Sequence, residues 1–158
     1  MIADMKAEDI VGDYREVSLQ LYGSIKRKIL YTEIETPYPD GKLIVSTTSP
    51  EGIITHVNRS FVEMSAYAED ELIGAPHSIL RHPDMPPAAF KDLWDTVALG
   101  KKWQGFVKNL RKDGGFYWVK ATVIPNVRGG QVVGYTSVRR KPSRTKVDEC
   151  SKLYPTLF

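Results

Sequence analysis

Residues 103–140 read WQGFVKNLRKDGGFYWVKATVIPNVRGGQVVGYTSVRR. Three β-prone runs, residues 103–111, 115–125 and 131–140, are separated by glycine-containing turns at 112–115 and 128–130. Such short turns join neighbouring antiparallel strands, because their glycines take the backbone angles that tight hairpins need. The stretch therefore predicts three consecutive antiparallel strands.

The segment before these strands has the pattern of a helix. Pro87 suits the first turn of a helix, and Gly100 suits its end. Between them, apolar residues recur at i, i+3, i+4 and i+7: Phe90, Leu93, Trp94 and Val97. The pattern predicts one well-formed amphipathic helix.

Residues 42–80 complete the domain with shorter elements. Two β-prone runs, 43–47 and 53–57, are joined by a turn at 49–52, and short helices are expected across 59–65 and 69–80. Asn58 can cap the first of these helices through its side-chain oxygen. The order predicts an α+β domain with a five-stranded antiparallel sheet and short helices on one face.

The N-terminal segment shows helical spacing of apolar residues. From residue 10 to 29, they are Ile10, Tyr14, Val17, Leu21, Ile25 and Ile29. We interpret residues 1–35 as an amphipathic helix for dimerisation or signal linkage, 36–41 as a linker, 42–141 as the folded domain and 142–158 as a C-terminal tail. The apolar end, residues 153–158, is expected to dock on a neighbour.

The amino-acid composition limits which binding partners and which cellular compartment are expected. The 158 residues carry a net charge of +3, spread along the chain, which argues against nucleic acid as a partner. The single cysteine, Cys150, allows no internal disulfide and fits a cytoplasmic setting. No signal peptide or apolar run of the roughly 18–20 residues needed to span a membrane is present. We expect no membrane contact by this chain itself.

The stretch 81–86, RHPDMP, gathers unusual chemistry. The Arg81 guanidinium can fork onto a phosphate or a carbonyl, or it can pair with Asp84 and fix the loop. His82 can donate to a ligand or cap the following helix, and Asp84 can orient either neighbour. Trp103 can stack on a flat ring or fill the core. The set is typical of a pocket for a flat, partly anionic cofactor.

Five further residues are candidates with competing structural roles. Asn58 and Asn109 carry amides that both donate and accept, but they can equally be a helix cap and a strand residue. Trp94 and Phe90 lie on the helix stripe that faces the core. His77 follows a proline in a short helix.

Order and spacing from about residue 43 to 140 resemble a PAS domain, in particular the N-terminal FAD-binding sensor domain of bacterial aerotaxis receptors. The patterns at 71–74 (ELIG) and 112–118 (KDGGFYW) are common to PAS domains. The 81–86 string followed by Trp103-Gln104-Gly105 and Val107-Lys108-Asn109 is more restrictive and is similar to the aerotaxis group.

The resemblance implies a non-enzymatic redox or oxygen sensor that holds FAD non-covalently. It implies a homodimer that signals to a downstream HAMP or methyl-accepting domain, and a place in the cytoplasmic part of a membrane receptor. The implied cofactor-binding residues are Arg81, His82, Asp84, Trp103, Asn109, Asn58, His77, Trp94 and Phe90.

Three other interpretations compete with the FAD-binding sensor. Light-driven adduct chemistry needs a cysteine beside the flavin, and residues 77–85 contain none. Haem is an alternative cofactor, with His77, His82 or His56 as the ligand. A cofactor-free dimerisation module is the third. Catalysis is not expected, because the chain lacks nucleophile-elbow, phosphate-loop and metal-ligand motifs.

Overall fold

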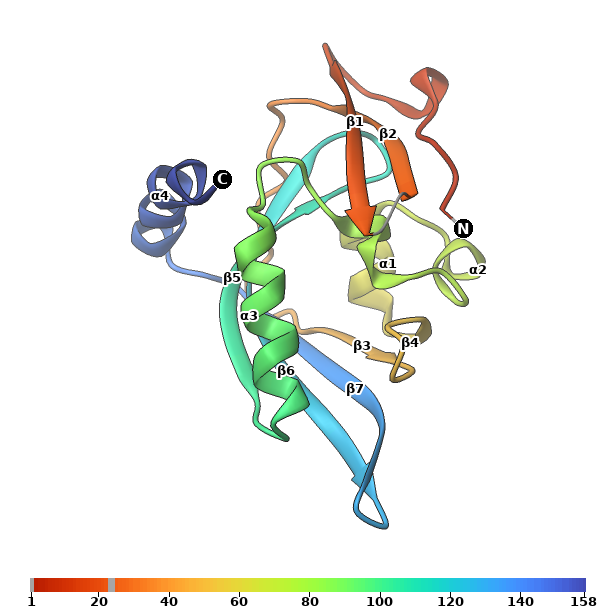
Figure 1. Ribbon diagram of the computed structural model, residues 1–158. Coiled ribbons are helices and arrows are strands. Elements are labelled where there is room, and N and C mark those ends of the chain that lie inside the picture. The colour runs from red at the N-terminus through yellow and green to blue at the C-terminus, as the bar shows by residue number, and fades with distance from the viewer. Residues whose placement is uncertain (1, 23–24) are drawn as a thin grey trace.

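The computed structural model describes residues 2–22 and 25–158, and its centre is an antiparallel sheet of five strands (Figure 1). The strand order is β4-β3-β7-β6-β5. The strands are β3 (Ile44–Thr48), β4 (Ile54–Val57), β5 (Trp103–Leu110), β6 (Phe116–Arg128) and β7 (Gln131–Arg140). The predicted five-stranded antiparallel sheet is therefore confirmed.

Helices cover one face of this sheet and enclose the main core. They are α1 (Arg59–Ser65), α2 (Glu69–Leu72), the 3-10 turn η2 (His77–Leu80) and α3 (Pro87–Ala98). Alternate residues of β6, beginning with Tyr117 and Val119, point into this core because successive side chains of a strand face opposite ways. Figure 1 shows α3 lying along β5 and β6.

The predicted helix signals are confirmed at both clear helices. The Asn58 side chain accepts a hydrogen bond from the Phe61 amide and caps α1. Pro87 occupies the first turn of α3. Gly100 follows the end of α3 with φ +74°, a conformation that an L residue with a side chain adopts only with strain.

The predicted helix at residues 10–29 is wrong where the structure describes it. Residues 15–22 and 25–31 form a two-stranded antiparallel sheet of β1 (Arg15–Tyr22) and β2 (Ile25–Tyr31), preceded by the turn η1 (Ala7–Asp9). Residues 23 and 24 lie outside the described residues. The physical reason is that Val17, Leu19 and Leu21 also alternate with polar residues, which is the period of a strand.

The N-terminal hairpin packs on the domain rather than standing apart from it. Met5, Ile29 and Leu30 form a second apolar cluster with Leu110 of β5. Arg27 is buried and donates to Ala3 O at 2.9 Å, Ile79 O at 2.9 Å and the Tyr67 hydroxyl at 3.0 Å. These bonds tie β2 to η2 and to the segment after α1. The role of residues 1–35 in dimerisation stays a prediction.

Replacing Arg27 with alanine is expected to lower the free energy of unfolding by about 2–4 kcal/mol, because two buried acceptors and one partly buried acceptor lose a charged donor. Chemical denaturation followed by circular dichroism measures this. Lys26→Ala, at the exposed neighbouring position of the same strand, is the control and should change the value by under about 0.5 kcal/mol. Equal, small effects of both substitutions would show that Arg27 does not anchor the hairpin.

The C-terminal segment is an ordered helix rather than a polar tail. Helix α4 (Arg144–Leu153) and the turn η3 (Tyr154–Leu157) cover the face of β5 and β6 that is opposite to α3. Val147 and Cys150 pack there against Phe116 and Trp118. Cys150 is thus separated from the main core by the sheet. Leu157 and Phe158 remain exposed, and the docking of this apolar end on a neighbour stays a prediction.

Candidate functional site

The loop that carries the RHPDMP string runs along the free edge of β5. Arg81 and Asn109 form an isolated antiparallel bridge. Residues paired across such a bridge project to the same face, and the next residue projects to the other. Arg81 and Asn109 therefore share the helix-covered side, whereas His82 turns toward the opposite side. The predicted site residues are divided between two groups.

Arg81 lies where the loop, α3 and the N-terminal hairpin meet. Its Nη1 donates to Leu21 O of β1 at 3.1 Å, and its guanidinium carbon lies 4.7 Å from the centre of the Phe90 ring. The buried Nε has no hydrogen-bond partner. Burial lowers the pKa of Arg81. The structure does not show the alternative pairing of Arg81 with Asp84, because Asp84 pairs with Lys108 at 2.8 Å.

Asn109 and Tyr117 are cross-strand neighbours on β5 and β6. Asn109 is 4% exposed and Tyr117 is 0% exposed. Among the described residues, neither the Asn109 Nδ2 nor the Tyr117 hydroxyl makes a hydrogen bond of good geometry, although the Asn109 side chain lies close enough to lower the pKa of Tyr117 somewhat. Burial raises the pKa of Tyr117 to about 12, so its hydroxyl keeps its proton near neutral pH. Asn109 is thus a buried residue rather than an exposed one.

Arg139 of β7 is a buried cation that the sequence reasoning missed. Its Nη2 lies 3.1 Å from Ser46 Oγ and 2.6 Å from His77 Nε2, and its guanidinium carbon lies 5.1 Å from the Phe61 ring centre. Its Nη1 has no partner. Because arginine only donates, His77 Nε2 must be the acceptor, so the His77 ring is neutral. Burial, with the nearby Arg139 charge, lowers the pKa of His77 to about 3.

His82 is buried within a separate aromatic group. Its ring meets Tyr31 and Phe116 edge-on at centroid distances of 5.7 and 6.0 Å. Its Nδ1 accepts from the Asp84 amide at 3.0 Å, which leaves the proton on Nε2, an atom without a partner. Burial, followed by the Lys108 charge, lowers the pKa of His82 to about 3. His82 is therefore a neutral donor.

Acidification should destabilise the protein through these neutral histidines. Their folded pKa of about 3 lies below the ordinary 6.5, so the unfolded chain binds more protons between these values. Stability should fall as pH drops from about 6.5, by up to about 1.4 kcal/mol per pH unit for each histidine. His82→Gln should flatten the slope measured by denaturation at several pH values. His56→Gln, at an exposed position, is the control, and equal slopes in both variants would contradict the assignment.

Three predicted residues make contacts within the protein, and their role in cofactor binding stays a prediction. The oxygen and the nitrogen of the Asn58 side-chain amide both bond to the backbone. Oδ1 accepts from Val45 N and Phe61 N at 3.1 Å, and Nδ2 donates to Leu43 O at 2.7 Å. Trp103 is 7% exposed and its Nε1 donates to Asp92 at 2.8 Å. Trp94 is 43% exposed and meets Tyr135 edge-on. None of these contacts involves Arg81, Asn109 or Arg139.

The unpartnered buried atoms share one chemical property. Among the described residues they are Arg81 Nε, His82 Nε2, Asn109 Nδ2, Arg139 Nη1, Tyr117 OH and Ser78 Oγ. Each can donate a hydrogen bond, and none is solely an acceptor. A buried polar group without a partner costs roughly 1–3 kcal/mol. Four of these atoms, Arg81 Nε, Asn109 Nδ2, Arg139 Nη1 and Tyr117 OH, belong to residues on the helix-covered side, which therefore suits a ligand rich in hydrogen-bond acceptors.

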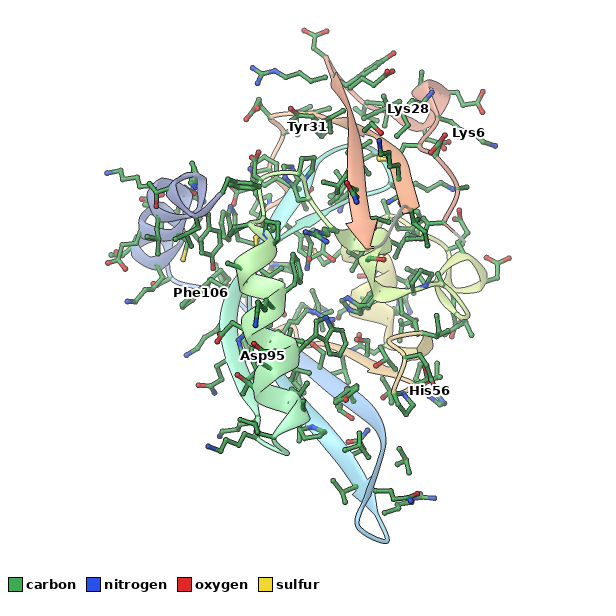
Figure 2. The ribbon with its side chains drawn as sticks, in the orientation of Figure 1. Lys6, Lys28, Tyr31, His56, Asp95 and Phe106 are labelled. Carbon is green, nitrogen blue, oxygen red and sulfur yellow. The ribbon has the colours of Figure 1, made fainter. Side chains whose placement is uncertain are left out.

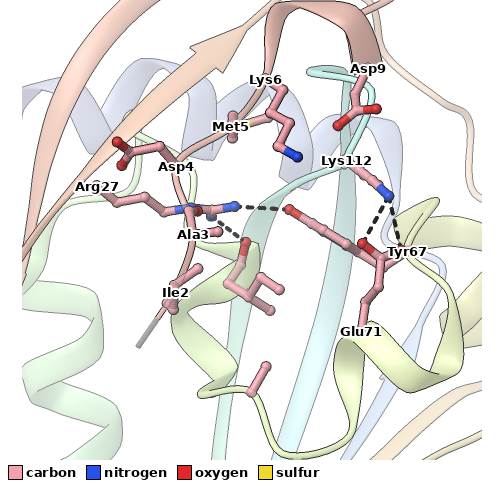
Figure 3. A pocket seen from close by; sticks show the side chains of 12 residues that line it. Ile2, Ala3, Asp4, Met5, Lys6, Asp9, Arg27, Tyr67, Glu71 and Lys112 are labelled. Carbon is pink, nitrogen blue, oxygen red and sulfur yellow. Dashed lines mark hydrogen bonds and ion pairs between the residues drawn. The ribbon is translucent and has the colours of Figure 1, made fainter.

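A surface pocket of about 340 Å³ lies elsewhere, between the N-terminal segment and α2 (Figure 3). Its lining includes Arg27, Tyr67, Glu71 and Lys112. Lys112 pairs with Glu71 at 2.8 Å, and Arg27 bonds to Tyr67. This pocket is distinct from the donor group. His56, another predicted haem candidate, lies exposed on β4, far from Tyr31 and the hairpin (Figure 2).

The sheet order and the helices on one face define an α+β domain of the kind found in light-oxygen-voltage proteins. A light-oxygen-voltage domain studied with a flavin analogue matches 73% of this chain and 88% of its own, with a TM-score of 0.64 and 23% identity. The aureochrome1 light-oxygen-voltage domain in its light state matches 72% of this chain and 88% of its own, with a TM-score of 0.61 and 23% identity.

The chain belongs to the PAS family, because the family model described as the PAS fold matches residues 54–139. The aerotaxis receptor of Escherichia coli K12 is 44% identical over 126 residues, which are 80% of this chain and 25% of the receptor. The biofilm dispersion protein BdlA of Pseudomonas aeruginosa is 32% identical over 94 residues, 56% of this chain and 22% of that protein. The chain thus spans about a quarter of these relatives. No helix of residues 2–22 and 25–158 has the length and apolarity to cross a membrane.

Proposed function

We propose that this PAS domain binds FAD non-covalently in its interior and transmits the flavin's redox state to a downstream signalling domain. The observation that carries the proposal is the set of buried donor atoms without acceptors. The similarity to the aerotaxis receptor supports it independently. The proposal includes a cytoplasmic setting, a homodimer and an output domain of HAMP or methyl-accepting type.

Different residues would bind different parts of the cofactor, according to how deeply each is buried. Arg81, only partly buried at the loop, would hold the phosphates, with Phe90 against its guanidinium. Asn109 and Tyr117, both buried, would donate to the flavin ring edge. A bound flavin supplies reversible electron transfer that changes the charge and hydrogen-bonding pattern of its ring. His82 and Asp84 would fix the loop, since they contact each other rather than the helix-covered side.

The contacts of Arg81 supply a route from the interior to the N-terminal hairpin. The Arg81 side chain bonds to Leu21 O of β1, and the Arg81 backbone forms a bridge to Asn109 of β5. A changed hydrogen bond at Asn109 would alter the position of Arg81 and thus the packing of β1 on the domain. The hairpin would then have two arrangements with different affinities for a partner, and the redox step would shift their populations.

Haem fits the histidines less well than FAD fits the donors. An iron ligand needs a free imidazole lone pair. In His77 the Nε2 lone pair accepts from Arg139, and in His82 the Nδ1 lone pair accepts from the Asp84 amide. Either histidine would have to give up one of these partly buried hydrogen bonds to bind iron through that nitrogen. The sensor role, rather than catalysis, is part of the same proposal.

The absorbance spectrum of the purified protein, before and after dithionite, tests the cofactor. We expect flavin bands in the blue region that bleach on reduction and a released chromophore that is FAD. An intense Soret band would replace the proposal with haem. A colourless protein that takes up neither FAD nor haem would favour the cofactor-free dimerisation module.

A further inference from the structure

Arg139 is a buried cation without an anion. It is 2% exposed, and no ion pair joins it to a carboxylate in residues 2–22 or 25–158. An uncompensated buried charge is costly, and proteins normally pair such a charge. Burial lowers the pKa of Arg139 to about 10, which still leaves it charged near neutral pH. Its surroundings therefore lack a partner that the charge requires.

Two neighbours hold one end of the guanidinium and leave the other end available. Ser46 Oγ and the neutral His77 Nε2 both lie within 3.1 Å of Nη2, whereas Nη1 makes no hydrogen bond. The Phe61 ring lies against the guanidinium carbon. The side chain is thus fixed in direction by its own contacts. His77 is a positioning residue in this arrangement.

The nearby unpartnered groups are donors as well. Burial raises the pKa of Tyr117 and the Arg139 charge lowers it, so the Tyr117 and Arg139 side chains lie within electrostatic reach. In the described part of the chain, the Tyr117 hydroxyl and the amide nitrogen of its cross-strand neighbour Asn109 make no hydrogen bond of good geometry. All three residues lie on the helix-covered side of the sheet. A ligand that meets them must present several acceptors, at least one of which can carry negative charge.

We propose that Arg139, positioned by His77 and Ser46, is a binding residue for the electron-rich acceptor edge of the flavin ring. This inference rests on the proposed function and adds a subsite to it. The ring edge is favoured over the phosphates because Arg139 lies deep in the domain, where removal of a doubly charged pyrophosphate from water is costly. The partly exposed Arg81 is the better phosphate partner. Arg139 also places a fixed positive charge beside the ring, which favours its reduced, more negative state.

The test uses three ligands that share the ring and differ in phosphate: riboflavin, FMN and FAD. Arg139→Met should weaken all three by the same factor, roughly ten- to hundred-fold, because the lost bond is made to the ring. Arg81→Ala should weaken FMN and FAD but leave riboflavin unchanged. The midpoint potential of flavin bound to Arg139→Met should also become more negative. Fluorescence titration of the apo protein and spectroelectrochemistry supply these values.

The stability of the apo protein gives a second, independent measurement. Because Arg139 is an uncompensated charge there, Arg139→Met should leave the free energy of unfolding unchanged or increase it, while flavin affinity falls. Arg139→Gln is a smaller change that can still donate to Ser46 and His77, and it should show the same loss of affinity. Arg140→Met, at the exposed next position of β7, is the matched control and should alter neither quantity.

The outcomes separate this inference from the proposed function. If the wild-type protein binds FAD but Arg139→Met and Arg139→Gln bind riboflavin with wild-type affinity and potential, the ring-edge subsite is overturned and the FAD proposal stands. If the wild-type protein binds no flavin, both fall. A loss of FAD and FMN affinity with unchanged riboflavin affinity in Arg139→Met would move Arg139 to the phosphates and contradict the ring assignment.

Discussion

Arg81→Ala is expected to weaken FAD binding roughly 100-fold or more, because the guanidinium supplies paired charge-assisted bonds to a phosphate. Arg81 is a predicted cofactor-binding residue in the 81–86 loop, and its side chain contacts both Phe90 of α3 and Leu21 of β1. Its Nε is already buried without a partner, so the side chain has donor capacity left for a ligand. Fluorescence titration of apo protein with FAD measures the change.

Two controls separate binding from folding. Arg59→Ala removes an exposed arginine that pairs with Glu63, and the FAD affinity of this variant should equal that of the wild type. The free energy of unfolding of apo Arg81→Ala should show whether loss of the Leu21 contact loosens the hairpin. Full FAD occupancy in a folded Arg81→Ala protein would remove Arg81 from the site.

Trp103→Ala is expected to lower the free energy of unfolding by about 3–5 kcal/mol, because a large buried side chain leaves a cavity. The indole lies in the main core, and its Nε1 bond to Asp92 joins β5 to α3. Gly105 contributes to this packing: a Cβ at that position would lie 2.3 Å from the Trp103 ring. Urea denaturation of the apo protein gives the value.

Two further substitutions serve as controls for Trp103→Ala: one at Trp94 and one at Trp103 itself. Trp94→Ala removes an indole that is 43% exposed and should cost under about 1.5 kcal/mol. Trp103→Phe keeps most of the volume and should recover most of the lost stability. A similar, small cost at both tryptophans, combined with loss of flavin only in Trp103→Ala, would restore the stacking role that the sequence suggested.

The sheet and helices could be predicted because their signals are local. Paired glycines mark the turns of β5, β6 and β7, and Pro87 and Gly100 mark the ends of α3. The helix prediction for residues 10–29 is wrong at 15–22 and 25–29 because their apolar spacing satisfies both a helical period and the alternation of a strand. What decides between the two is the packing of Ile29 and Leu30 on Leu110, a contact between distant parts of the chain.

The site could be predicted in part, for the same reason. Arg81 and Asn109 belong to motifs that are compact in sequence, and the structure brings them together across one bridge. Arg139 pairs with Ala121 in the register of β6 and β7, and only its long side chain brings its charge within reach of Tyr117. One local signal was available: a strand of alternating pattern places Arg139 on the inward side. The partly buried His77 bonds to Arg139 as a positioning residue, while Asn58 caps a helix.

A crystal structure of the protein grown with FAD tests the central claim most directly. We expect the flavin within the domain, with Arg139 Nη1, Tyr117 OH and Asn109 Nδ2 bonded to its ring edge and Arg81 bonded to phosphate. An interior filled by protein side chains, with these donor atoms bonded to protein or water and FAD absent or on the surface, would contradict it.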